Sequence, residues 1–229
     1  MVDLHALPFC LNEEQYDWVI KTFEPMGVEE KIGQLFILLK ATPGVDEAQL
    51  KTPVNESHLG GFRWQNESAA DAYRQNTTLQ KISRIPILIA SNCDDEGNGA
   101  APEGTFVATA VECGAGAGTE NAYHLGYVAA KETSAVGGNL LFNPVVDVYK
   151  NWRNRIVNTR AFSDDPDTVL ANARAFIRGA KAVNPNIGCT AKHFPGDGVE
   201  ELDQHLSLAV NTLSVEDWGK PITEKSTAS

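Results

Sequence analysis

Apolar and polar positions along the chain follow two patterns, short apolar runs and longer stretches of mixed polarity. Several short runs carry consecutive apolar residues rather than strict alternation, which is typical of strands buried on both faces. The runs predict five strands, at Gln34–Leu39, Leu59–Trp64, Pro86–Ser91, Asn139–Val146 and Ile187–His193.

The longer stretches between these runs have the pattern of amphipathic helices. They predict helices at Ser68–Ile82, Thr119–Ala135 and Asp167–Ala182, with Asn12–Phe23 and Val28–Ile32 as helical segments before the first strand. Asp164-Asp165-Pro166 supplies a capping residue and a proline at an early helical position, which is a helix start signal. A strand followed by a helix, repeated along the chain, indicates a parallel α/β fold.

Polar residues lie at or just after the ends of several predicted strands: Arg63, Asn92, and the pair Lys192 and His193. Parallel barrels and doubly wound sheets gather their chemistry at such carboxyl ends, so both architectures remain open at this point. A complete eight-stranded barrel typically needs ~250 residues, so the chain is short for a complete one. The predicted organisation is a helical segment (1–27), an α/β domain (28–218) and a polar tail (219–229).

Charge and composition narrow the function classes. The net charge of −11 argues against binding nucleic acid or anionic lipid. The longest apolar run near the N-terminus, Leu35–Leu39, is far too short to span a membrane, and no basic-then-apolar leader opens the chain. Four cysteines lie far apart without a CxxC pair, which favours free thiols in a reducing compartment. We expect a cytoplasmic protein.

One stretch, AKHFPGDGVEELDQHLSL (191–208), gathers candidate chemistry. Pro195-Gly196 predicts a turn after Lys192 and His193. Asp203 lies two positions before His205, so its carboxylate can orient the imidazole and leave one ring nitrogen free for proton transfer. Two alternatives remain open: a simple hydrogen bond within a loop, and a metal site that uses His193, Asp197, Asp203 and His205, for which no tight ligand spacing exists.

At this stretch the chain resembles the N-terminal catalytic domain of family 3 glycoside hydrolases, particularly the β-N-acetylhexosaminidase branch. That branch has the pattern KH(F/I)PG-x-G, then four residues, then D-(S/T)-H. Here Lys192–Gly198 and Asp203-Gln204-His205 match it in spacing, with Gln204 in place of the small hydroxyl residue. Further similar segments, in the same order, are Glu29–Leu35, Leu59–Phe62, Asn143–Val148 and Asn158–Phe162.

The resemblance implies that residues 28–218 form a (β/α)8 TIM-type barrel truncated at its C-terminal side, with about five to six of its strands present. It implies hydrolysis of a terminal β-linked N-acetylhexosaminide with retention and without a metal or organic cofactor. It implies that His205 is the acid/base, that Asp203 holds its tautomer, and that Arg160, Lys192 and His193 bind sugar hydroxyls. A sugar-binding aspartate follows the third strand of the family. Asp94 matches by motif, whereas counting from Pro86 puts Asn92 at the equivalent place.

A retaining glycosidase also needs a nucleophilic carboxylate near the acid/base. In the family this residue lies beyond the sixth strand, and no aspartate of this chain occurs in the matching context, so we assign no nucleophile. We therefore expect little or no hydrolase activity from the 229 residues alone. An incomplete barrel also exposes strand edges and apolar helix faces, so self-association is expected.

Two other functions compete with the glycosidase hypothesis. A predicted strand at Thr105–Val111 followed by Gly114-Ala115-Gly116-Ala117-Gly118 suggests a dinucleotide site, although the third glycine comes one position early for G-x-G-x-x-G. The second alternative is a sugar-binding module without catalysis, in which Arg160, Lys192 and His193 still bind a hexosamine.

Overall fold

A computed structural model describes residues 2–39, 47–65, 67–94, 100–211 and 213–217. Its centre is a parallel sheet of five strands in the order β1-β2-β3-β4-β5. The strands are β1 (Ile37–Leu39), β2 (Gly61–Arg63), β3 (Leu88–Ser91), β4 (Leu140–Leu141) and β5 (Gly188–Cys189). Because every strand runs in the same direction, all carboxyl ends meet at one edge of the sheet. The predicted incomplete parallel α/β architecture is confirmed.

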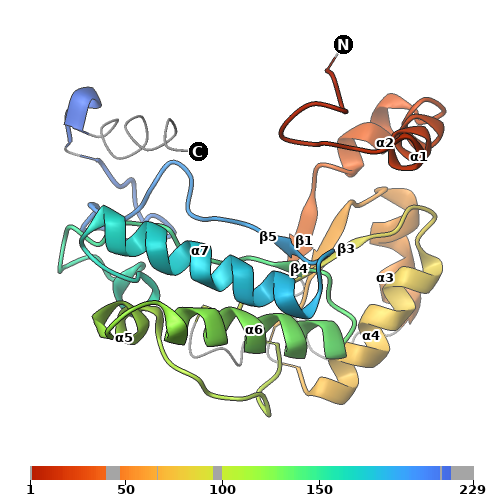
Figure 1. Cartoon of the computed structure of the whole chain (residues 1–229). Coiled ribbons are helices and arrows are strands. Elements are labelled where there is room, and N and C mark those ends of the chain that lie inside the picture. Colours follow the sequence, from red (N-terminus) through yellow and green to blue (C-terminus); the bar gives the residue numbers. More distant parts are fainter. Residues whose placement is uncertain (1, 40–46, 66, 95–99, 212, 218–229) are drawn as a thin grey trace.

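Helices connect the strands and cover the outer face of the sheet (Figure 1). The long helices α6 (Glu120–Ala135) and α7 (Pro166–Val183) pack side by side along their length. Between them and the sheet lies a core that includes Phe62, Ile89, Leu141 and Phe176. The other helical segments are α1 (Glu13–Phe23), α2 (Val28–Gly33), α3 (Glu47–Lys51), η1 (Thr52–Glu56), α4 (Ala69–Ile82), α5 (Ala110–Ala115) and η2 (Asn158–Arg160).

The start signal at Asp164-Asp165-Pro166 acts as predicted, because Asp165 caps α7 by accepting a hydrogen bond from the backbone of Thr168. Ser68, at the start of the predicted helix 68–82, caps α4 in the same way by accepting one from Asp71. Pro166 is the first residue of α7, where its missing N–H costs nothing. The predicted helices therefore agree with the structure to within two residues at each end.

The predicted strands were too long at their ends. Gln34 is not in a strand, because its backbone N–H donates to Glu30 and ends α2. The ladder between β4 and β5 is interrupted near Pro144, which has no N–H to donate, and resumes only as an isolated bridge between Val145 and Lys192. The predictions Asn139–Val146 and Ile187–His193 thus included the loops that form the edge of the sheet.

Some short segments were missed, and one was wrongly predicted. The sequence pattern did not reveal α3, η1, α5 or η2. The strand suggested at Thr105–Val111 is wrong, because this segment is a loop that leads into α5. Gly114 lies inside α5 and contacts the backbone of Phe162 closely rather than opening a nucleotide loop. The dinucleotide hypothesis loses its strand and therefore its structural basis.

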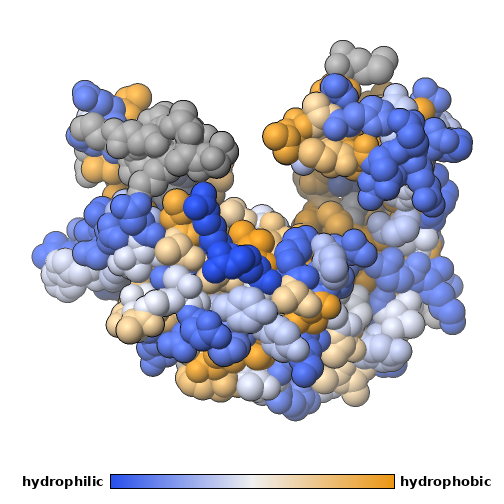
Figure 2. Space-filling view, in the orientation of Figure 1, coloured by the Kyte–Doolittle hydropathy of each residue, from blue (hydrophilic) through white to orange (hydrophobic). Residues whose placement is uncertain are grey.

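The N-terminal helices lie apart from the α6–α7 layer (Figure 1), and α1 buries no residue. Figure 2 shows apolar residues at the surface of this N-terminal part. Exposed large apolar side chains here include Trp18, Phe23, Ile32, Leu35 and Phe36. Among the helices that the structure describes, none combines the length and apolarity needed to cross a membrane. The predicted self-association through exposed apolar surface stays a prediction.

Candidate active site at the carboxyl edge of the sheet

The carboxyl ends of β2 to β5 and the loops after them enclose a hollow of about 440 Å³. The strand ends supply its floor, and the loop that follows β5 supplies part of its rim. Its lining residues are Arg63, Asn92, Asp94, Phe142, Ile156, Arg160, Lys192, His193, Asp197, Gln204 and His205. The structure therefore brings five of the six sequence-predicted site residues to one hollow, and the sixth, Asp203, contacts His205.

Asp94 is the electrostatic centre of this hollow. Its side chain is only 3 % exposed, and its Oδ2 atom accepts from Lys192 Nζ at 2.8 Å and from Arg160 Nε at 3.0 Å. Its Oδ1 atom accepts from the amide of Asn143 at 2.8 Å. One buried carboxylate thus pairs with two cations that come from different loops. Residues 95–99, which complete the sequence motif around Asp94, lie outside the described residues.

Lys192 joins both residues that the sequence suggested for the third strand. Its Nζ atom donates to Asn92 Oδ1 at 2.5 Å as well as to Asp94, so the choice between Asn92 and Asp94 does not arise in the structure. Burial lowers the pKa of Lys192, and the negative charge of Asp94 opposes that shift. Burial also lowers the pKa of Arg63, which lies on the same floor.

His193 lies between Arg160 and a buried carboxylate. Its Nε2 atom is 3.0 Å from Arg160 Nη2, and its Nδ1 atom is 2.7 Å from Asp147 Oδ2. Since a guanidinium can only donate, Nε2 accepts from Arg160 and Nδ1 carries the ring proton. Arg160 itself is held by the backbone carbonyl of Ile156 and by Asp94. Hydrogen bonds thus connect Asp147, His193, Arg160, Asp94 and Lys192 in sequence.

Asp203 and His205 form a contact on the loop that passes the hollow. The Nδ1 atom of His205 is 2.8 Å from Asp203 Oδ1, which also accepts from the backbone N–H of His205 at 2.8 Å. The His205 side chain is 73 % exposed and lines the hollow, whereas Asp203 lines a neighbouring one with Trp152 and Arg153. The ring is therefore reachable from both solvent and the hollow.

The contact between Asp203 and His205 predicts how the Asp203 carboxyl titrates in acid. Hydrogen bonds from the backbone and then from the ring of His205 lower the pKa of the Asp203 carboxyl. The resulting stabilisation is present above the unfolded-state pKa and is lost as the pH falls through the lower folded-state pKa. We expect the carboxyl carbon of Asp203, followed by NMR, to titrate below the ordinary value of ~3.9.

The His205→Ala variant separates the two causes of this shift. Alanine removes the ring but keeps the backbone N–H, so the Asp203 pKa should rise only part of the way to its ordinary value. A midpoint at or above the ordinary value in the unmodified chain would show that the contact does not hold in solution.

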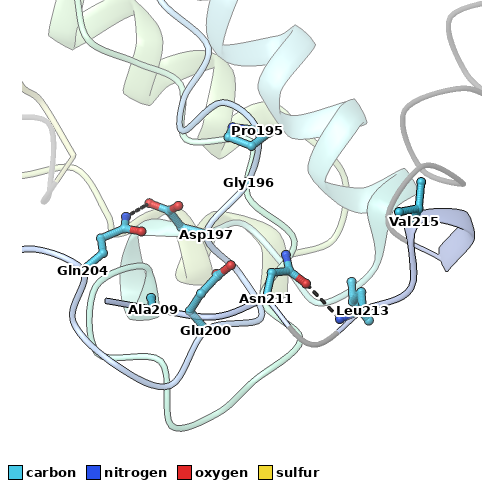
Figure 3. Close-up of a pocket in the computed structure, with 9 residues that line it drawn as sticks. All are labelled: Pro195, Gly196, Asp197, Glu200, Gln204, Ala209, Asn211, Leu213 and Val215. Atoms are coloured by element: carbon cyan, nitrogen blue, oxygen red, sulfur yellow. Dashed lines mark hydrogen bonds between the residues drawn. The ribbon is translucent and has the colours of Figure 1, made fainter. Parts of the chain in front are cut away.

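Gln204 connects the same loop to the floor. Its amide donates to Asp197 Oδ2 at 2.5 Å, a contact drawn in Figure 3. Figure 3 also shows that Asp197 and Gln204 border a second hollow, together with Glu200 and Asn211. Gln204 replaces the small hydroxyl residue of the family pattern, and its longer side chain makes a support contact to Asp197. Gln204 and Asp197 therefore belong to the walls of both hollows.

The four residues considered as a metal site do not form one cluster. His193 Nδ1 is 3.8 Å from Asp197 Oδ2, while Asp203 and His205 pair with each other on the rim. Within the part of the chain that the structure describes, no three His, Cys, Asp or Glu side chains are grouped as metal ligands.

Sequence reasoning assigned no role to Arg63 and Asp147. Arg63 is the last residue of β2 and Asp147 lies in the loop after β4, and this position near the carboxyl edge was the available signal. Asp147 also lies inside the segment Asn143–Val148, which resembles the family, but nothing in a linear pattern connects it to His193, 46 positions away. Only the parallel neighbours β4 and β5 bring the two loops together.

Comparison with known proteins supports a single family. Residues 27–218 match the model described as "Glycosyl hydrolase family 3 N terminal domain". A "Beta-N-acetylglucosaminidase/beta-glucosidase" of Cellulomonas fimi is 39 % identical over 218 residues, which are 95 % of this chain and 38 % of that protein. A "Beta-hexosaminidase" of Pseudomonas aeruginosa is 41 % identical over 98 residues, 43 % of this chain and 29 % of that protein.

Solved structures agree. "Beta-glucoside phosphorylase BglX bound to 2FGlc" has a TM-score of 0.85 and 36 % identity, over 95 % of this chain and 39 % of that one. NagZ of Neisseria gonorrhoeae, at 23 % identity, has the same fold, with a TM-score of 0.70 over 81 % of this chain and 57 % of that one. The chain spans well under half the length of the first relatives that it matches. The chain belongs to glycoside hydrolase family 3, as its sequence motif predicted, and carries that family's N-terminal domain.

Proposed function

We propose that this chain supplies the sugar-binding and proton-transfer groups of a retaining exo-β-N-acetylhexosaminidase. The observation that carries the proposal is the position of His205. Its ring contacts Asp203 at 2.8 Å and lines the same hollow as Arg160, Lys192 and His193. A proton donor that faces a cluster of sugar-binding groups is the arrangement that glycosidic bond cleavage needs.

The proposed chemistry assigns the proton steps to His205. Asp203 accepts a hydrogen bond from Nδ1–H and fixes the ring, so that Nε2–H of the imidazolium can protonate the leaving glycosidic oxygen. The neutral ring then takes a proton from the water that attacks the glycosyl intermediate. The intermediate itself requires a second carboxylate, and we assign that role to none of the described residues.

The proposed sugar-binding groups are Asp94, Arg160, Lys192 and His193. They combine one buried carboxylate with fixed donors, so a sugar hydroxyl can donate to one group and accept from another. Charged hydrogen bonds in a partly buried hollow stabilise a transition state most when they tighten as the ring gains positive charge. The name of the Cellulomonas fimi relative includes an N-acetylglucosaminidase beside a β-glucosidase, and the Pseudomonas aeruginosa relative is named a hexosaminidase. Together these names favour a hexosaminide as the sugar.

Calorimetry tests the sugar assignment on the 229-residue chain. We expect methyl N-acetyl-β-glucosaminide to bind, methyl β-glucoside to bind more weakly, and Arg160→Met to lose most of the affinity. An exposed arginine outside the hollow, changed as Arg74→Met, is the matched control. Stronger binding of the glucoside, or equal affinity in Arg160→Met, would contradict the assignment.

An external nucleophile separates an enzyme from a binding module. We expect little turnover of nitrophenyl N-acetyl-β-glucosaminide by the chain alone. Azide can attack the anomeric carbon in the role for which we assign no carboxylate, while the bond to the nitrophenolate breaks. Nitrophenolate leaves without a proton, so the assay is repeated with a glycoside whose leaving group must be protonated. If azide-dependent release from this second glycoside falls in His205→Ala, the result supports an enzyme. Sugar binding without azide-dependent release supports a module.

A second candidate reaction is phosphorolysis. The supporting observation is that the "Beta-glucoside phosphorylase BglX" structures match 95 % of the chain at 36 % and 35 % identity. In this reaction inorganic phosphate, rather than water, takes the glycosyl group. Formation of a sugar 1-phosphate when phosphate replaces azide in the same assay would favour this candidate.

A further inference from the structure

Asp147 is a buried carboxylate outside the set of groups proposed to touch the sugar. It follows β4, and its side chain is 0 % exposed. Its two oxygens accept three hydrogen bonds. Oδ2 accepts from the ring Nδ1 of His193 at 2.7 Å and from the backbone N–H of His193 at 3.1 Å. Oδ1 accepts from the backbone N–H of Asp197 at 2.6 Å. Such an arrangement fixes both the loop and the ring.

The other groups around His193 define what Asp147 contributes. Arg160 Nη2 donates to Nε2 from the side of the hollow. Asp197 Oδ2 is 3.8 Å from Nδ1, which is beyond hydrogen-bonding distance. Lys192 and Asp94 lie on the far side of Arg160 and contact each other. Among the described residues, Asp147 is thus the hydrogen-bond acceptor for Nδ1.

We propose that Asp147 is a positioning residue that keeps His193 in its Nδ1-protonated tautomer, with the Nε2 lone pair directed at the sugar site. This inference rests on the proposed function, because it assigns the tautomer a role in binding a hydroxyl group. A sugar hydroxyl that donates to Nε2 and accepts from Arg160 can replace the direct contact between these two side chains. In the opposite tautomer, Nε2–H and the Arg160 guanidinium would both be donors. They would face each other without an acceptor, and neither could accept from the hydroxyl.

Replacement by asparagine tests this role because the amide has a single acceptor oxygen. If that oxygen faces His193, the amide NH₂ faces the N–H of Asp197. If it faces Asp197, the NH₂ faces the ring. The two backbone donors cannot release their protons, whereas the ring can move its proton from Nδ1 to Nε2. We therefore expect Asp147→Asn to shift the His193 tautomer and to weaken sugar binding about 10-fold, the loss of one hydrogen bond.

Two measurements on the 229-residue chain follow the tautomer and the affinity separately. Long-range ¹⁵N–¹H correlation spectra above neutral pH distinguish the tautomers of the five histidines, and His193→Gln assigns the ring. Calorimetry with methyl N-acetyl-β-glucosaminide gives the affinity. Asp197→Asn is the matched control. It neutralises the other carboxylate near Nδ1 but keeps the backbone N–H that Asp147 accepts, so the tautomer should stay unchanged.

The outcomes separate this inference from the proposed function. An Nδ1-protonated His193 in the unmodified chain, shifted in Asp147→Asn and unchanged in Asp197→Asn, supports Asp147 as the positioning residue. An Nε2-protonated ring in the unmodified chain overturns it even if Asp147→Asn does not fold. An unshifted ring or unchanged affinity in a folded Asp147→Asn also overturns it. Failure of the unmodified chain to bind the sugar contradicts the proposed function, while the spectra still decide the tautomer.

Discussion

Asp94→Asn should abolish measurable sugar binding and destabilise the fold by about 3–5 kcal/mol, the cost of removing one partner from a buried charge pair. The reason is that all its contacts at the site are donors: Arg160, Lys192 and the amide of Asn143. An asparagine offers one acceptor oxygen, and its NH₂ must face a donor. Two cations then share the floor of the hollow without their carboxylate. Calorimetry and urea denaturation measure the two losses.

The pH dependence identifies the cause of this destabilisation. Burial already lowers the pKa of Lys192, and Asp94 opposes that shift, so the pKa should fall further in Asp94→Asn. An unfolded chain then binds more protons than the folded one, and stability rises with pH below the ordinary lysine value of ~10.4. We expect the unfolding free energy of the variant to rise more steeply with alkaline pH than that of the unmodified chain.

Asp17→Asn is the control for this prediction. Asp17 pairs with Lys21 at 2.9 Å on the exposed surface of α1, where an ion pair contributes about 0–1 kcal/mol. It should leave sugar binding unchanged. If Asp94→Asn cost no more stability than Asp17→Asn, the buried charge network would not exist in solution.

Gly126→Ala should destabilise the chain by about 3 kcal/mol, the upper range for an overpacked core. Gly126 in α6 lies against α7, and an added Cβ atom would come within 2.0 Å of the Phe176 carbonyl oxygen. Alanine favours a helix over glycine by about 1 kcal/mol, so propensity alone predicts the opposite sign. The expected clash outweighs the helix propensity, because the neighbouring oxygen belongs to the backbone and cannot move away by a side-chain rotation.

A glycine in open space provides the comparison for this second variant. At Gly27 the nearest atom to an added Cβ is Glu30 Oε2, 3.9 Å away. Gly27 is the N-cap residue of α2, where alanine is less favourable than glycine, so Gly27→Ala should lower the urea midpoint, but by less than Gly126→Ala. A midpoint for Gly126→Ala at or above that of Gly27→Ala would mean that α6 and α7 pack less closely than the structure has them.

Several elements followed from local sequence alone. The capping residue Asp165 and the helix-starting Pro166 placed the start of α7 correctly, because their effect is confined to the first turn. Strand ends could not be placed in this way. The ladder between β4 and β5 depends on which residue of one strand pairs with which residue of the other. Pro144, which follows β4, interrupts this ladder, so the end of β5 depends on a residue of the neighbouring strand.

The candidate site likewise has one part that local sequence predicted and another part that depends on the fold. The motif Lys192–His205 identified the family and contains four of the six predicted site residues, because the spacing within one loop is a local property. The motif did not identify Asp147 and Arg63. These residues lie near the motif only in the folded chain, where parallel strands place distant loops at one edge of the sheet. His193 and Asp147 are 46 positions apart and 2.7 Å apart at the contacting atoms.

The sequence by itself determined the alternation of buried strands and helices and the family. These properties depend on local spacing and on burial periodicity, which a linear pattern carries in full. Only the tertiary structure decided that one carboxylate pairs with two cations, that Asp147 contacts the ring of His193, and that α6 and α7 touch through Gly126. Those features are distances between segments far apart in the chain, and such distances are fixed by packing and by the register of the sheet.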